Sequence, residues 1–172
     1  MRSHLLAIAL CAVAAALPTA SRAQAPSLAG DYLYVAEGSD DVNRAIETAV
    51  ARMNFVTRPI ARGRLRRTNI PYRTLQIAHT PTTISVHADQ AAPVVAPASG
   101  QQIRWRREDG ETFDVSTEWD GPALVQTFRA EDGQRVNRYT LAPGGDTLIM
   151  TVSVTSPRLA RPLTSALRYA RR

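Results

Sequence analysis

The residues of this chain that could do acid–base or metal chemistry are few and scattered. Beyond the first 25 positions there is no cysteine, and the two histidines are His79 and His87. Alternation along strands would place their side chains on opposite faces of one hairpin, whereas a metal site needs two or three convergent ligands. Glu108-Asp109 and Glu131-Asp132 offer paired carboxylates, but each pair precedes a glycine at a predicted turn. We therefore expect no metal, no cofactor and no enzymatic activity.

A second group of residues suits the binding of a small apolar molecule. Large apolar side chains and a few isolated polar ones fall at positions that alternation assigns to one face of the predicted strands. In a ligand site, apolar walls supply most of the contact and a few polar groups orient the molecule. The candidate ligand-binding residues are Trp105, Phe113, Trp119, Gln126, Phe128, Asn137, Tyr139, Met150 and Ser165.

Regularly spaced turn signals indicate the elements that would hold these residues. Asp109-Gly110, Asp120-Gly121, Asp132-Gly133 and Gly144-Gly145 recur every 11 to 12 residues, and the runs between them alternate apolar and polar side chains. This pattern predicts consecutive antiparallel hairpins. We expect a mainly β chain that forms an antiparallel up-and-down β-barrel of about ten strands. Residues 91–100 contain two prolines and form at best a short edge strand, so a gap in the barrel wall is expected there.

Two helices are predicted between the first strand and the rest. A β-rich run over 28–36 ends at Gly38, and Asp41 is a suitable N-cap. From Val42 to Met53 apolar residues recur at helical spacing, which predicts an amphipathic helix. A second, shorter helix would have Pro59 in its first turn and end before residue 69. The helix pair thus covers about residues 40–68.

The first 23 residues are predicted to be a secretory signal peptide. Arg2 and His4 precede an apolar run over 5–17, which Pro18 ends. The run is too short to span a bilayer. Cleavage is expected after Ala23, because cleavage at the alternative site would leave Pro26 beside the scissile bond. The remaining residues, 24–172, suffice for a single β-barrel domain, which we expect in the periplasm or outside the cell.

Positive charge gathers in the predicted helix pair. No aspartate or glutamate occurs between Thr48 and Ala88, so a basic surface is expected there. This surface could contact an anionic membrane. Alternatively, it is a solvated helix face that acids of the sheet, such as Asp114 and Glu118, balance. Nucleic acid is not expected, because no aromatic platform interleaves the arginines. The candidate anionic-surface contacts are Arg58, Arg62, Arg64, Arg66 and Arg67.

The order of elements resembles the calycin superfamily, in particular the fatty-acid-binding-protein barrel, where one strand, a helix-turn-helix lid and nine strands follow one another. Gly30-Asp31-Tyr32 is similar to the Gly-x-Trp opening of lipocalins. Arg168 resembles the last-strand arginine that packs over that aromatic ring. The Arg-x-Tyr head-group pair of the fatty-acid binders is here Arg168-Tyr169, adjacent residues that must point to opposite faces, so that carboxylate clamp is not carried over.

Two functions from different classes follow. The first is an exported periplasmic binding protein for a lipid or another apolar or amphipathic molecule, as the resemblance implies. The second is an envelope structural or interaction protein without a ligand, which contacts an anionic membrane or a partner through the arginine-rich helix pair. The barrel interior distinguishes them. An open space of roughly 300 Å³ or more favours the first function, and a fully packed interior favours the second.

Overall fold

The computed structural model describes residues 27–172, so the predicted signal segment and its cleavage site lie outside the described residues. Ten strands and two helices follow one another in the predicted order, with both helices directly after the first strand. The elements are β1 (Gly30–Val35), α1 (Val42–Val50), α2 (Thr57–Thr68), β2 (Thr74–His79), β3 (Thr83–Ala88), β4 (Val94–Pro97), β5 (Ile103–Arg106), β6 (Thr112–Asp120), β7 (Ala123–Ala130), β8 (Gly133–Leu141), β9 (Thr147–Thr155) and β10 (Leu163–Arg171).

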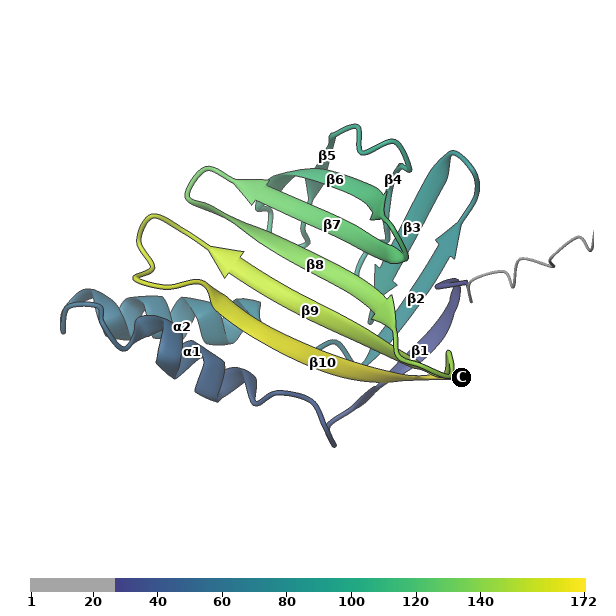
Figure 1. Cartoon of the computed structure of the whole chain (residues 1–172). Helices are drawn as coiled ribbons and strands as arrows, with labels where there is room; N and C mark the ends of the chain where they lie inside the picture. The colour runs from purple at the N-terminus through teal and green to yellow at the C-terminus, as the bar shows by residue number, and fades with distance from the viewer. Residues whose placement is uncertain (1–26) are drawn as a thin grey trace, which may run out of the picture.

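The ten strands form one antiparallel sheet that curls into a nearly closed barrel (Figure 1). The first strand joins the two halves, since β1 pairs with β2 on one side and with β10 on the other. The sheet ends at β4 and β5, where β4 approaches β6 and a single bridge joins Ser99 to Glu118. The short edge strand and the interruption of the wall expected around residues 91–100 are therefore both present.

The four predicted turn signals all connect neighbouring strands. They join β5 to β6, β6 to β7, β7 to β8 and β8 to β9. Gly110 and Gly121 have φ angles of 89° and 58°, in the left-handed region that favours glycine. The alternation between the turns is confirmed as well, because the predicted inward residues Leu124, Tyr139 and Leu148 are at most 1% exposed.

The two helices lie together across one end of the barrel, at left in Figure 1. The Asp41 carboxylate accepts hydrogen bonds from the backbone N–H groups of Asn43 and Arg44, as its expected N-cap role requires. Ile46 and Val50 of α1 pack against Leu163 of β10. The second helix was expected to be the shorter one, which is wrong: α2 has 12 residues and α1 has nine. Tertiary contacts such as those described below offset the low helix propensity of glycine within α2.

Side chains fill the end of the barrel away from the helices, which we call the filled end. Its core includes Leu124, Leu148 and Met150, each 0% exposed. Tyr32 packs into the same core, and Arg171 rather than the expected Arg168 lies over its ring, 5.2 Å from the centroid. The strand register explains this correction, because Tyr32 is paired with Arg171 and Val35 with Arg168. Within residues 27–172, no helix is long and apolar enough to cross a membrane.

Candidate functional site

A cavity of about 1140 Å³ occupies the end of the barrel under α2, which we call the open end. Ile60 and Leu65 of α2 form its roof, and the inner faces of strands β3 to β9 form its walls. Its lining is predominantly apolar. The space exceeds the volume expected to distinguish an open barrel from a packed one. The interior of this barrel is therefore open at one end and filled at the other.

Six of the nine candidate ligand-binding residues line this cavity. Three of them form an aromatic cluster in the wall made by β5, β6 and β7. In this cluster the ring centroids of Trp105 and Phe128 lie 5.8 Å apart, and those of Trp105 and Phe113 lie 6.1 Å apart. The six residues are Trp105, Phe113, Gln126, Phe128, Asn137 and Tyr139.

Three candidates lie away from the cavity. Met150 is fully buried in the core of the filled end. Ser165 is buried on β10 and is not among the residues that line the space. Trp119 is 38% exposed and packs edge-on against His79, with ring centroids 5.3 Å apart. Alternation places a side chain on the inner face, but it does not say at which level along the barrel the interior is open.

A chain of polar side chains crosses the wall formed by β7 and β8. The Arg135 Nε donates to Asn137 Oδ1 at 2.8 Å, and Asn137 Nδ2 donates to the Tyr139 hydroxyl at 3.3 Å. That hydroxyl donates in turn to Gln126 Oε1 at 3.3 Å. Burial raises the pKa of Tyr139, which further favours the protonated phenol that donates this hydrogen bond. Among the described residues, Gln126 Nε2 is a buried donor with no partner.

Sequence reasoning missed Arg135, which lines the cavity with a half-buried side chain. The signal was present, because Arg135, Asn137 and Tyr139 alternate along β8 and therefore share its inner face. The register agrees, since Arg135 is paired with Phe128 on β7 and Val154 on β9, both of which line the cavity. An inward arginine is unusual in a strand, since charged side chains are rarely buried without a partner.

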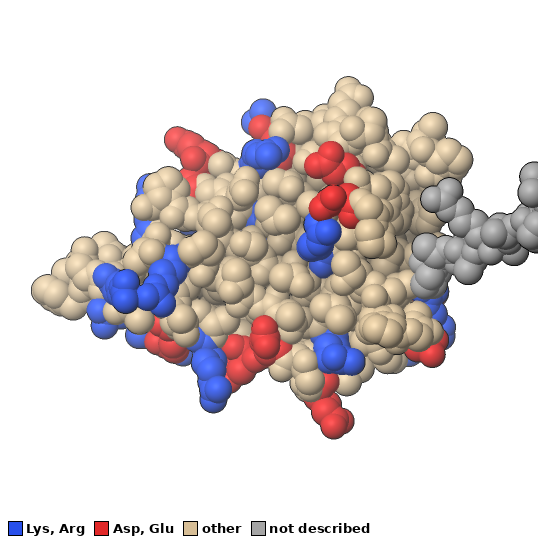
Figure 2. Space-filling model, viewed as in Figure 1, with Lys and Arg blue, Asp and Glu red and all other residues tan. Residues whose placement is uncertain are grey.

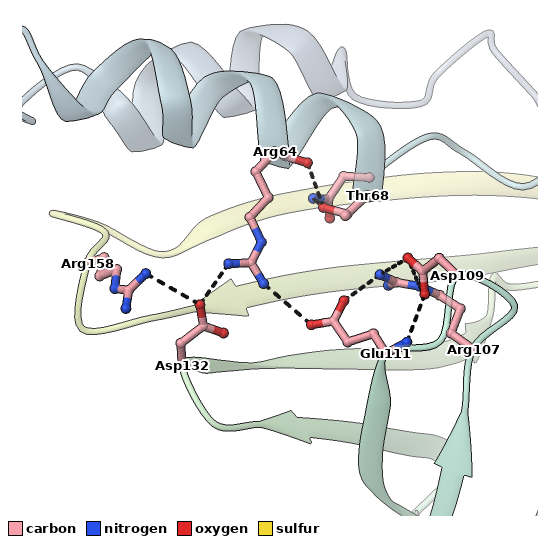
Figure 3. A network of polar contacts seen from close by, with 8 residues as sticks. Arg64, Thr68, Arg107, Asp109, Glu111, Asp132 and Arg158 are labelled. Carbon is pink, nitrogen blue, oxygen red and sulfur yellow. Dashed lines mark hydrogen bonds and ion pairs between the residues drawn. The ribbon is translucent and has the colours of Figure 1, made fainter.

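Ion pairs tie α2 to the rim of the open end (Figure 3). Arg64 reaches from α2 to Asp132, in the turn between β7 and β8, at 2.7 Å and to Glu111, beside β6, at 3.4 Å. Arg107 pairs with Glu111 and with Asp109, and its hydrogen bond lowers the pKa of the Asp109 carboxyl. We call the two contacts of Arg64 the rim ion pairs. They join elements that lie far apart in the sequence and hold the roof over the cavity.

The arginines of the helix pair have more acidic neighbours than the sequence suggests. Arg62 and Arg66 both pair with Glu47 of α1, at 2.8 Å and 3.1 Å. Arg58 donates to the Met53 carbonyl. In Figure 2 blue and red atoms are accordingly mixed over the helices at left. Of the five candidate surface contacts, three are thus paired with carboxylates, and Arg58 and Arg67 form no ion pair with any other part of residues 27–172.

No family model matches this sequence, and no curated protein matches it. Solved structures do resemble its fold. The REP1-NXSQ fatty acid transporter is 15% identical with a TM-score of 0.54, over 84% of this chain and 96% of that one. Human cRBP IV is 15% identical with a TM-score of 0.54, and the match covers 85% of this chain and 98% of that one. A fatty-acid-binding protein from the brain of Drosophila melanogaster is 14% identical with a TM-score of 0.55, and the match covers 84% of this chain and 99% of that one.

These likenesses and the nearly closed barrel of ten strands define the class of fold. The chain has a calycin-like fold, in which a helix pair follows the first strand and covers an apolar cavity. The resemblance stated from the sequence is confirmed for the fold. The similar structures are those of binding or transport proteins. Within residues 27–172, no three histidine, cysteine, aspartate or glutamate side chains are grouped as a metal site requires.

Proposed function

We propose that this chain is a binding protein, without enzymatic activity, for a lipid or another apolar or amphipathic small molecule. The observation that carries the proposal is the apolar cavity of about 1140 Å³ under α2. Side chains that line a space of this size lack packing contacts on one side. A bound ligand would supply those contacts. The similarity in fold to fatty-acid binders and transporters supports the same function.

The two tryptophans of the chain allow a sharp test. Trp105 lines the cavity and Trp119 lies away from it. A fatty acid that carries bromine atoms on its chain, which quench tryptophan only at short range, should therefore quench the fluorescence of a Trp119→Phe variant, in which Trp105 is the remaining tryptophan. The matched Trp105→Phe variant should bind the probe with little quenching. Ligand at about 100 times its Kd should add about 2.7 kcal/mol to the unfolding free energy and raise the Tm. Absence of probe binding to the parent protein would refute the function.

We also propose that the protein acts after export, in the periplasm or outside the cell. The support is the apolar run over 5–17 with its basic flank and the small residues around Ala23. The intact mass of the protein recovered from the periplasm should correspond to a chain that starts at Gln24. A mature form that retains the first 23 residues would contradict this proposal.

We propose further that the helix pair contacts an anionic membrane, where ligand could be exchanged. The specific observation is an apolar tip beside the arginines, with Phe55 84% and Val56 58% exposed. Vesicles that contain phosphatidylglycerol should bind the protein at low salt, and salt should weaken the binding. A Phe55→Ser/Val56→Ser double variant should bind less, whereas Val95→Ser, a change of an exposed apolar residue on β4, should have no effect. Equal binding of all three proteins would contradict this role.

A further inference from the structure

The open end of the barrel contains a buried hydrogen-bond donor without an acceptor. Gln126 is 1% exposed, and its amide oxygen already accepts a hydrogen bond from Tyr139. Its Nε2 lacks any partner within residues 27–172, although the side chain lines the cavity. A buried amide nitrogen that loses its water without gaining an acceptor is costly. A ligand that carries an acceptor oxygen would remove that cost.

A positive charge without a carboxylate lies beside this donor. The Arg135 guanidinium donates to Asn137 Oδ1, to the Thr68 carbonyl at 3.1 Å and to Asn69 Oδ1 at 3.2 Å, all neutral oxygens. Its carbon lies 5.7 Å from the centroid of the Tyr72 ring. In the described part of the chain, no carboxylate forms an ion pair with Arg135.

Most other charged groups that line the cavity are already engaged, the exception being Arg67 in the helical roof, which forms no ion pair within residues 27–172. Arg64, Arg107 and Arg158 pair with acids at the rim. The Asp89 carboxylate, which also lines the cavity, accepts hydrogen bonds from the backbone N–H groups of Arg73 and Thr74. Among the described residues of the strand walls, Arg135 is therefore the arginine that has no ion pair and whose charge is available to a ligand.

Gln126 and Arg135 lie close enough to bind one head group. Gln126 is paired with Asn137 across β7 and β8, and Arg135 is two residues from Asn137 on the same inner face. Such diagonal neighbours are about 7–8 Å apart, within the reach of two long side chains. The aromatic cluster lies beside them, because Phe128 is paired with Arg135.

We propose that the ligand is an amphiphile with a carboxylate, whose oxygens accept hydrogen bonds from Arg135 and from Gln126 Nε2 while its apolar chain packs against the aromatic cluster. This inference rests on the proposed binding function and adds the head-group chemistry and its location. The head-group site belongs to β7 and β8 under the C-terminal end of α2, where Thr68 and Asn69 also contact Arg135. It does not involve β10, where Arg168 lies on the opposite face from the buried Tyr169.

Two ligands that differ only in the head group test the site. Dodecanoate and 1-dodecanol should each displace Nile red, a neutral probe, from the parent protein. We expect dodecanoate to bind about tenfold more tightly or better, since a charge-assisted hydrogen bond is roughly twice as strong as a neutral one. Arg135→Gln should remove this preference, and Arg135→Lys should keep part of it. The matched control is Arg138→Gln on the same strand, where Arg138 points outward to Asp120, and it should keep the full preference.

The ratio of the two affinities is the deciding quantity, because a loosened α2 would weaken both ligands alike. Gln126→Leu should lower the affinity for dodecanoate more than the affinity for the neutral 1-dodecanol. If Arg135→Gln keeps the parent preference, or if the parent binds both ligands equally, the head-group site is wrong and the binding function stands. If the parent binds neither ligand nor Nile red, the binding function fails and the head-group site fails with it.

Discussion

The two ends of this barrel are built from the same strands but are packed in opposite ways. At the filled end, β9 contributes Leu148 and Met150, both 0% exposed, and β1 and β10 contribute Tyr32 and Tyr169. At the open end, β5, β6 and β7 contribute the aromatic cluster of Trp105, Phe113 and Phe128, whose rings remain partly exposed. One end has the close packing of a protein core. The other keeps a space that its own side chains do not fill.

The difference follows from which residues face each other across the interior. The filled end joins large side chains from both halves of the sheet. At the open end, the cavity lining combines the aromatic cluster with small residues, among them Ala88, Ala91 and Ala92. The roof is α2, whereas α1 packs against β10. The barrel thus separates the part that stabilises the fold from the part available for a ligand, and each prediction below tests that separation.

Truncation of the same residue type at the two ends should have the largest effect. Leu148→Ala removes a fully buried side chain of the filled end and should cost about 2–5 kcal/mol of unfolding free energy. Leu65→Ala on α2 enlarges a cavity that already exists, so its cost should be at least about 1 kcal/mol lower because no new enclosed void forms. Urea denaturation measures both values. Equal costs would show that the open end is as tightly packed as the filled end.

Larger side chains at the two ends should reveal the same contrast in stability. Met150→Trp adds volume to a closed core and should cost about 1–3 kcal/mol through overpacking. Phe128→Trp adds volume next to the cavity, so stability should be nearly unchanged while the affinity for a fatty-acid probe falls. Thermal unfolding and probe titration measure the two effects. Lost stability in both variants, without any change in binding, would contradict an open cavity beside Phe128.

Alkaline pH should destabilise the core, because burial raises the pKa of Tyr169 and of Tyr32 above the ordinary value of 10.0. A raised pKa in the folded state gives stability that is complete below about pH 10 and is lost as the pH rises further, by about 1.4 kcal/mol per pH unit for each such group. Tyr169→Phe removes one of these phenols, and its hydroxyl has no partner among the described residues. This variant should lose stability less steeply above pH 10, as denaturant titrations would show. An unchanged slope would contradict the assignment.

Loss of the rim ion pairs should have the smallest effect on stability. Arg64→Gln removes both contacts of α2 with the rim, and exposed ion pairs contribute about 0–1 kcal/mol each. Ligand release should nevertheless become faster, because these contacts hold the roof over the cavity (Figure 3). Arg66→Gln on the same helix, which contacts Glu47 of α1 instead, is the control. Stopped-flow release rates that are equal in the two variants would contradict a role of the rim ion pairs in retention.

Several features of the fold could be predicted because they depend on local chemistry. The Asp-Gly turns, the Asp41 N-cap and the alternation of the strands each depend on a few neighbouring residues, and all are confirmed. Errors arose where distant residues decide the outcome. The arginine over Tyr32 depends on the register between β1 and β10. The length of α2, which was expected to be the shorter helix, depends on the contacts that α2 makes with the rest of the chain.

The candidate site divides in the same way. Alternation alone placed Gln126, Phe128 and Asn137 on the inner face, and it could equally have placed Arg135 there. Which inward residues meet the cavity was decided only by the tertiary structure, since the space at each level depends on side chains from several strands. The same holds for the charge of α2, whose Arg64 finds its acids 47 and 68 residues further along the chain. Local patterns determine the face of a side chain, and only the packed barrel determines its neighbours.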